Sequence, residues 1–361
     1  MSSIRWLTLL AVFIGAFARA EVPPLEAYGK LPDLDSSRLS PSGRRLATIA
    51  NVEGTRRLIV IETDGKLVMQ TAVNDITIRD LQWAGENYVV AVTSSTQNLG
   101  IEYGFRHELY NAVVLDLEHR TFRLLIDSSN REIFGAAFGF YGMVERHGHW
   151  LAFVGALPLL HNSHTNHVML AEDTSTQLTS IDLGNGEIKR EAPGYGNNQS
   201  WVIDKTGKVL ANDGYEAPKK KWSLYAGDHR DHLLVELNNR LGDNTLLGQG
   251  RTAGTVLYVM HDEDGGAHYM EEALSGTNPP VEILQDWTVH RFIHDPVTGL
   301  LVGAIKESDS PSPELFDEQL QSNMRAARLT FPERVVQFAS WSDDFSRFVV
   351  ITVHAIQALC G

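Results

Sequence analysis

The sequence contains almost no cysteine: Cys360 is the only one in 361 residues. No disulfide can form within the chain, so packing alone must stabilise the fold. The sequence also has no excess of basic residues, since 31 Lys and Arg face 45 Asp and Glu and give a formal net charge of −14. Because such a charge repels phosphate backbones and anionic lipid surfaces, we expect neither nucleic acid nor membranes as partners of the mature chain.

Long apolar runs are also absent, except at the start. Residues 7–17 form an apolar run that follows Arg5 and precedes Ala18-Arg19-Ala20, an arrangement typical of a secretory signal peptide and its cleavage site. We predict that residues 1–20 are a signal peptide cleaved near Ala20, and that the mature chain is periplasmic or secreted. The alternative is an uncleaved membrane anchor, for which the run is short.

The sequence does contain a recurring unit of an apolar residue, a short polar turn and a strand. The segment LSPSGRRLA at Leu39–Ala47 returns as WSDDFSRFV at Trp341–Val349, with looser copies between them. A spacing of about 50 residues is typical of the four-stranded blades of a β-propeller. We count six repeats and a fraction, and predict an all-β, seven-bladed β-propeller over residues 21–353 whose last blade is incomplete. In its third unit we expect strands at Met143–Arg146, Trp150–Gly155, Val168–Ala171 and Gln177–Asp182. Three tryptophans are expected to be wedges between blades: Trp83, Trp201 and Trp341.

One helix is predicted before the last blade. Ser312 suits its N-cap and Pro313 suits its first turn. The apolar residues that follow share one helical face: Phe316, Leu320, Met324 and Ala327. We expect this face to pack on the outside of the sheets. After the strand at Phe348–Thr352, residues 354–361 show neither turn chemistry nor strand alternation, so we interpret them as an atypical C-terminal tail.

The order of these motifs resembles the N-terminal propeller of the prolyl oligopeptidase family of serine peptidases, in the secreted branch with dipeptidyl and acylaminoacyl peptidases. The likeness rests on five segments: residues 28–32, Leu39–Ala50, Ile78–Trp83, Phe292–Gly299 and Ser340–Asp344. The resemblance implies a propeller that restricts access and helps position peptide substrates, while a following α/β-hydrolase domain supplies the Ser, Asp and His of catalysis.

That hydrolase domain is not expected within this chain. The sequence has no Gly-x-Ser-x-Gly motif and no alternating βα pattern that could build the domain. We therefore predict that the chain has no catalytic residues, does not cleave peptides by itself, and is a truncated copy of the family pattern. We also predict no cofactor and no metal.

Two patterns have the residue types of a metal site, and each also has a simpler interpretation. The histidines at His161, His164 and His167 could bind zinc on a helix, but the Asn and Ser residues between them favour a loop. Asp262 and Asp264 resemble part of a calcium loop, but the alternating oxygen ligands ending in Glu are missing, which favours a hairpin turn.

Two groups of carboxylates likewise have both a functional and a structural interpretation. Glu271 and Glu272 are similar to the paired glutamates with which dipeptidyl peptidases hold a substrate amine, but they fall within an expected outer strand. Asp204, Asp343 and Asp344 could form the acid and base pair of a glycosidase. Their position in the repeated turn predicts instead that they cap turns through side-chain hydrogen bonds.

Three functions follow from these patterns. The first is the non-catalytic, substrate-gating propeller of a prolyl-oligopeptidase-like peptidase, with peptides as partners. The second is a stand-alone periplasmic propeller, similar to TolB, that binds a protein or a small ligand. Such a propeller would need residues 21–38 to complete its last blade. The third, an enzyme with its site in the propeller funnel, is the least favoured.

Overall fold

The structure is a computed structural model. It describes residues 34–354, apart from the short segments 74–75, 99–105, 128, 162–167, 170–174, 196–199, 309–312 and 333. The predicted signal peptide, Cys360 and residues 355–361 of the predicted tail lie outside the described residues. Within the described part of the chain, no helix is long and apolar enough to cross a membrane.

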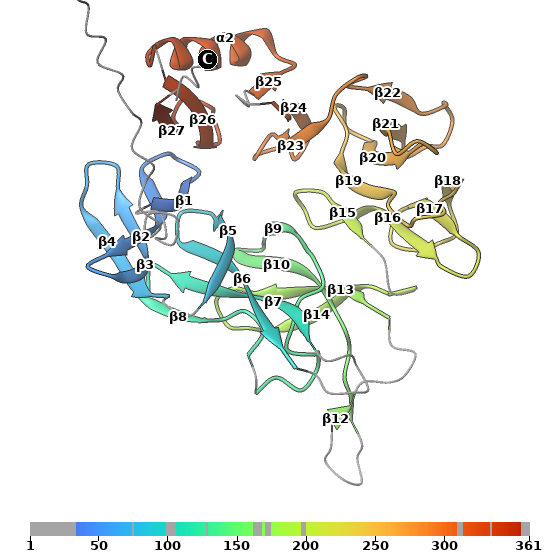
Figure 1. The fold of residues 1–361 in the computed structure, drawn as a ribbon. Helices are drawn as coiled ribbons and strands as arrows, with labels where there is room; N and C mark the ends of the chain where they lie inside the picture. The colour runs from blue at the N-terminus through green and yellow to red at the C-terminus, as the bar shows by residue number, and fades with distance from the viewer. Residues whose placement is uncertain are drawn as a thin grey trace, which may run out of the picture.

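The described residues form antiparallel sheets that follow one another around a central axis (Figure 1). Each sheet begins at the axis and proceeds outward along the chain, as expected for propeller blades. The strands of the first three blades are β1 Leu34–Leu39, β2 Arg45–Val52, β3 Thr55–Glu62 and β4 Leu67–Ala72; β5 Thr77–Ala84, β6 Tyr88–Gln97, β7 His107–Asp116 and β8 Thr121–Leu124; and β9 Phe140–Arg146, β10 His149–Ala156, β13 Gln177–Asp182 and β14 Ile188–Ala192.

The second half of the chain continues the ring and brings its last sheet beside the first. Strands β26 and β1 are neighbours, although some 300 residues separate Arg38 from its hydrogen-bond partner Ala339. The remaining strands are β15 Trp201–Ile203, β16 Val209–Glu216, β17 Lys221–Ala226 and β18 Leu233–Asn238; β19 Thr245–Gln249, β20 Thr255–His261, β21 Ala267–Ala273 and β22 Val281–Ile283; β23 Val289–His294, β24 Leu301–Lys306 and β25 Pro313–Leu315; and β26 Arg334–Trp341 and β27 Phe348–His354.

The all-β propeller with one helix is confirmed for the described residues, but the predicted count of seven blades is not. Blades 1 to 6 are β1–β4; β5–β8; β9, β10, β13 and β14; β15–β18; β19–β22; and β23–β25. After them, β26 and β27 form a sheet of only two strands. The sequence repeat counts inner hairpins, and β26–β27 is such a hairpin without described outer strands. A repeat of the hairpin therefore does not establish a complete blade.

Two local predictions were wrong. Val168–Ala171 was expected to be a strand of blade 3, but β12 Val168–Met169 pairs with β11 Leu160–His161 in a separate two-stranded sheet, and β13 takes the expected place beside β10. The predicted helix start at Ser312 and Pro313 was also wrong, because Pro313 begins β25 and Ser312 lies outside the described residues.

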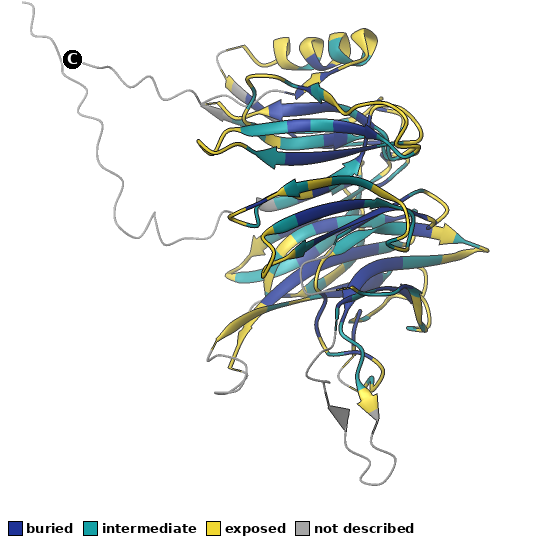
Figure 2. Cartoon of the chain, turned by 90° about the vertical axis from the view of Figure 1, so that its right-hand side faces the viewer, coloured by how far each residue is buried: buried dark blue, intermediate teal, exposed yellow. Residues whose placement is uncertain are grey.

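The helix α2 spans Glu318–Leu329, and its N-cap is Asp317, whose side chain accepts a hydrogen bond from the Leu320 N–H at 2.9 Å. Asp at this position satisfies a backbone donor that the first helical turn leaves unpaired. Met324 is buried, and Leu320 packs against the same apolar cluster. The helix lies at the edge of the ring, with an exposed outer face (Figure 2), so its predicted outside packing is confirmed.

The core is a series of apolar layers between successive sheets. Separate clusters join blades 1 and 2, 2 and 3, 3 and 4, 4 and 5, and 5 and 6, and another joins blade 6 with β26–β27 and α2. Trp201 is 3% exposed in the layer between blades 3 and 4, which confirms it as a wedge. Each sheet thus buries its faces against its neighbours along the ring.

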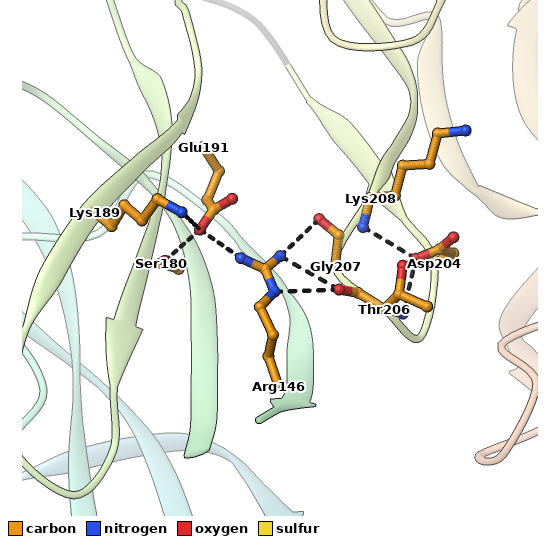
Figure 3. Close-up of polar contacts among 8 residues, drawn as sticks. All are labelled: Arg146, Ser180, Lys189, Glu191, Asp204, Thr206, Gly207 and Lys208. Atoms are coloured by element: carbon orange, nitrogen blue, oxygen red, sulfur yellow. Dashed lines mark hydrogen bonds and ion pairs between the residues drawn. The ribbon is translucent and has the colours of Figure 1, made fainter. Parts of the chain in front are cut away.

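Arginine side chains add polar ties between blades. Arg146, at the end of β9, forms an ion pair with Glu191 at 2.9 Å and donates to the carbonyls of Thr206 and Gly207 in the blade 4 turn, both at 3.3 Å (Figure 3). Ser180 also donates to the Glu191 carboxylate at 2.8 Å. One guanidinium therefore links the outer strand of blade 3 to the inner turn of blade 4, with its donors satisfied.

Candidate ligand-binding channel

A large cavity lies on the ring axis. It has a volume of about 890 Å³ and receives residues from the inner strands of blades 1, 2 and 3 and from the inner turns of blades 4 and 6 and of β26–β27. A second cavity of about 350 Å³, between blades 3 to 6, shares Lys205 and His294 with it. The two cavities share part of their walls, and we call them together the channel. Volumes of this order are typical of sites for small ligands.

The turns between the first two strands of the sheets share a hydrogen-bonding pattern. The N–H of Asp204 donates to Lys208 O at 2.9 Å, and the N–H of Ser342 donates to Arg347 O at 3.0 Å. Ser40 and Asp295 occupy the same place in blades 1 and 6. In all four turns the next residue lines the large cavity: Pro41, Lys205, Pro296 and Asp343. Two of these four positions therefore present opposite charges to the channel, and two present proline.

Asp204 and Asp344 cap their own turns, as the sequence predicts. One Asp204 oxygen accepts from the Thr206 N–H at 2.8 Å and the Lys208 N–H at 3.0 Å. Burial raises the pKa of Asp204, but these hydrogen bonds outweigh it and leave the pKa below its usual value. Hydrogen bonds from the Ser342 hydroxyl and from Ser346 lower the pKa of Asp344 to about 2. Both carboxylates are occupied by turn donors.

Asp343 was predicted to be a third turn cap, and the structure corrects this. Its backbone N–H donates to Pro41 O at 2.9 Å, but among the described residues its carboxylate accepts no hydrogen bond and forms no ion pair. Burial raises the pKa of Asp343, and the nearby Asp295 and Glu86 raise it further, whereas Lys205 lowers it. The side chain lines the cavity, while the N–H donors of the turn bond to the Ser342 hydroxyl and to the Asp344 carboxylate.

Lys205 is the cation that faces this carboxylate. Its ammonium group has no hydrogen-bond or ion-pair partner in the described part of the chain. Burial lowers its pKa, while Asp343 and Asp295 act in the opposite direction. Blade 4 and β26–β27 are not neighbours in the ring, so the two charges influence each other across the channel. Their separation exceeds the 4.0 Å of an ion pair.

His294 adds an unsatisfied polar atom to the wall. Its Nε2 is buried and has no partner among the described residues. Burial lowers the pKa of His294, a backbone hydrogen bond with Gln249 raises it, and Lys205 lowers it. Gly248 leaves room for the ring, because a Cβ there would lie 2.8 Å from Nε2. A neutral imidazole at this place can donate or accept one further hydrogen bond.

The opposite wall is rigid and already paired. Arg38 and Asp80 form an ion pair at 3.0 Å, and Gln82 donates to the same carboxylate at 2.9 Å. Trp83 donates from its indole N–H to Arg38 O at 2.9 Å. Trp341 lines the cavity and also packs on the apolar cluster beside it. Trp83 and Trp341 are therefore both wedges, as predicted, and parts of the channel wall.

The other residues considered from the sequence lie away from the channel. Glu271 is 8% exposed and is bound by the Arg251 N–H at 2.7 Å, the Arg251 guanidinium at 2.8 Å and the Thr255 hydroxyl at 2.7 Å, so it stabilises the blade 5 turn. Glu272 is 2% exposed on β21, and burial raises its pKa. Neither residue lines a described cavity on the axis.

The two metal patterns have different outcomes. Asp262 accepts from the Asp264 N–H at 2.9 Å and the Gly266 N–H at 2.7 Å, which confirms the hairpin turn. The side chain of His161, with His164 and His167, lies outside the described residues. Within the described residues, no group of three or more His, Cys, Asp or Glu side chains is arranged to hold a metal ion.

Of the comparisons with known proteins, only the one with solved structures found proteins similar to this chain. No family model and no curated protein matches it. Among solved structures it is similar to an acylaminoacyl peptidase in complex with Z-Gly-Gly-Phe-chloromethyl ketone (12% identity, 85% of this chain and 48% of that one, TM-score 0.46) and to the β-propeller domain of the Trilobed protease from Pyrococcus furiosus (13%, 79% and 81%, 0.43). It is also similar to the Dos1 propeller (11%, 88% and 75%, 0.46).

The chain spans about half the length of the acylaminoacyl peptidase that it matches. Two of these solved structures are of a peptidase and of a protease's propeller domain. They assign no role to any residue of the channel. Sequence reasoning missed Lys205, His294 and the free carboxylate of Asp343, although aligning the repeated turns by their cap residues would have shown two charges where the other turns carry proline.

Proposed function

We propose that this chain is the non-catalytic, substrate-gating propeller of a serine peptidase resembling prolyl oligopeptidases, and that its channel admits and holds peptides. The observation that carries the proposal is the axial cavity of about 890 Å³, to which blades 1, 2, 3, 4 and 6 and β26–β27 contribute. The motifs of the resemblance and the absence of a Gly-x-Ser-x-Gly elbow support it. A site that gates and positions substrate needs a cavity of this size but no nucleophile.

The wall chemistry suits a peptide. Tyr141, Trp83 and Trp341 offer aromatic surface, and Lys205, His294 and Asp343 offer polar groups that no other described side chain occupies. Peptides combine apolar side chains with amide and terminal groups, so a channel with both kinds of wall can bind them without fixing one sequence.

We also propose that β26–β27 is the inner half of a seventh blade that completes the ring. Supporting this, its turn has the hydrogen bonds of the blade 4 turn, and Arg347 donates to Gly43 O at 2.9 Å much as Arg146 reaches the blade 4 turn. We further propose export of the mature chain. N-terminal sequencing of the secreted product should begin near Glu21, and retention of residues 1–20 would contradict cleavage.

The test uses the purified mature chain with a fluorescein-labelled octapeptide whose ends are blocked. We expect saturable binding by fluorescence anisotropy and no cleavage of the peptide by mass spectrometry. Pro296→Trp, which fills the mouth of the channel, should weaken binding by about ten-fold. Thr298→Trp, in the same turn but not lining the cavity, is the matched control. Cleavage that copurifies with the chain, or equal binding by both variants, would refute the proposal.

The alternative is a stand-alone periplasmic propeller that binds a small ligand or a protein. A specific observation favours it: hydrogen bonds within this chain join β26–β27 to blade 1. A single cooperative thermal transition of the purified chain would support an independent module. A broad transition, with early loss of the blade 1 signal in hydrogen exchange, would favour the peptidase portion.

A further inference from the structure

Lys205 and Asp343 are the starting point, because each is a charge without a partner that faces the same cavity. Charged side chains in partly enclosed places are normally paired, since desolvation without compensation is costly. Other charges nearby follow this rule. Asp295 accepts from the Val297 N–H at 2.9 Å and the Thr298 N–H at 2.6 Å, and Glu86 accepts from the Ser42 N–H at 2.7 Å.

The two free charges stand on opposite sides of the channel. Lys205 belongs to the blade 4 turn, and its stem passes the blade 6 turn, where a Cβ on Gly299 would lie 3.5 Å from its Cε. Asp343 belongs to the β26–β27 turn, whose backbone is held to Pro41 of blade 1. Both turns are anchored by the capping carboxylates of Asp204 and Asp344, and in the structure the two charges form no ion pair.

We propose that the mouth of the channel binds a zwitterionic ligand, a free α-amino acid or a short peptide with free ends, with its carboxylate on Lys205 and its ammonium group on Asp343. The inference rests on the proposed function of the channel and names the substrate class. Such a ligand pairs both charges at once, which no ligand with a single charge does. Trp341 and Trp83 line the same cavity and can contact an apolar side chain of the ligand.

Glu145 is the competing site for an ammonium group. It also lines the cavity, and no hydrogen bond or ion pair joins it to another described side chain. It differs from Asp343 in that it is exposed on blade 3 and is not among the charges that influence Lys205. Asp343 is therefore the carboxylate that we assign to the ammonium group, and Glu145 is the alternative that the test below must exclude.

The probe is the dipeptide Ala-Phe in four forms: free, N-acetylated, C-amidated, and blocked at both ends. We expect isothermal titration calorimetry on the purified mature chain to show free Ala-Phe binding at least about ten-fold more tightly than either singly blocked form. Phenylalanine, triglycine and tetraglycine, each with free ends, then distinguish an amino acid from a longer peptide as the preferred ligand.

Substitutions assign each end of the ligand. Asp343→Asn should abolish the preference for a free amino end and keep the preference for a free carboxylate, and Lys205→Met should do the reverse. The matched controls Asp344→Asn and Lys208→Met, in the same two turns, should keep both preferences, and thermal melts verify that every variant folds. Loss of the amino-end preference in Glu145→Gln, but not in Asp343→Asn, would overturn the assignment to Asp343.

The outcomes separate this inference from the function on which it rests. If blocked and free dipeptides bind equally while the blocked octapeptide still binds, the zwitterion site is wrong and the peptide channel stands. If neither dipeptide nor octapeptide binds, both proposals fail. If an amino acid binds and no peptide does, the zwitterion site stands and the peptide function fails.

Discussion

Blade 1 has two sides that are held in different ways. Toward blade 2 it buries Ile49, Leu58 and Val60 in an apolar cluster. Toward β26–β27 no apolar cluster of the described residues spans the contact, and hydrogen bonds take its place: Arg38 to Ala339 O at 3.1 Å and Leu39 N–H to the Ser340 hydroxyl at 3.0 Å.

The two kinds of contact contribute differently to the stability of the ring. The stabilising free energy from apolar burial grows with the buried area and does not depend on the orientation of the groups. A hydrogen bond within the protein replaces one to water, so its net contribution to stability is small, and it requires a narrow range of distances and angles. The apolar layers therefore account for most of the stability, and the polar seam fixes how the first and last sheets meet. The seam is also where Asp343 enters the channel, so the weaker contact is next to the candidate site.

The largest expected effect comes from breaking the apolar side of blade 1. Leu58→Ala, at a site with 0% exposure, should lower the free energy of unfolding by about 3 kcal/mol, because it removes buried methyl groups and leaves a cavity. Urea denaturation followed by circular dichroism measures the change. Leu67→Ala, at 50% exposure on β4 of the same blade, is the control and should change it by less than about 0.5 kcal/mol.

Removing a hydrogen bond between blade 1 and β26–β27 should lower the free energy of unfolding by less, and should affect only the strands near that contact. Ser340→Ala leaves the buried Leu39 N–H without its acceptor, and we expect a loss of about 1.5 kcal/mol. Amide hydrogen exchange should become faster in the peptide that contains Leu39 and remain unchanged in β16 and β17. Ser275→Ala, on an exposed turn, is the control. If exchange accelerates equally in all blades, the seam is not a separate unit.

The contrast between these two sides shows what the sequence could predict. Period-two strands and turn residues predicted the inner hairpins correctly, since local chemistry decides both. The partner of a strand is not a local property, so Val168–Ala171 was assigned to the wrong sheet. The helix start failed for a similar reason: Pro313 suits a first helical turn, but here it pairs with Ile305 in blade 6.

The candidate site was predictable only in part. The capping role of Asp204 and Asp344 follows from the turn that contains them, and the structure confirms it. Asp343 was grouped with them because it is adjacent to Asp344 in sequence, yet the donors of this turn bond to Asp344 and to the Ser342 hydroxyl. Which side chains face the axis depends on the closure of the ring, and no segment of the sequence contains that information.

A smaller effect of opposite sign is expected at the seam itself. The folded-state pKa of Asp343 is raised, so its ionised form destabilises the fold as pH rises through that pKa, and no penalty exists below the unfolded value of ~3.9. Asp343→Asn should therefore raise the melting temperature by about 1–2 °C at neutral pH and have no effect below pH ~4.

Asp344→Asn is the matched control, with the reverse sign. Because the pKa of Asp344 falls to about 2 in the folded state, its charge stabilises the fold above the unfolded pKa, and this contribution is lost as pH falls toward 2. The variant should melt earlier than the native chain at neutral pH. A rise in melting temperature for both variants would mean that general relief of negative charge, and not the place of each carboxylate, explains the result.

The smallest expected effect is a shift in the titration midpoint of Asp343, which needs no change in the stability of the fold. In the native chain, carboxyl-carbon NMR of aspartate-labelled protein should give a midpoint of about 2 for Asp344 and one above the usual aspartate value for Asp343. Lys205 lowers the pKa of Asp343 from across the channel, so Lys205→Met should move the Asp343 midpoint upward and leave Asp344 unchanged. Lys208→Met should move neither. Because Lys205 is in blade 4 and Asp343 in the last sheet, only a ring that is closed in solution brings the two charges close enough for this response, and an unchanged Asp343 midpoint would mean that the seam is open.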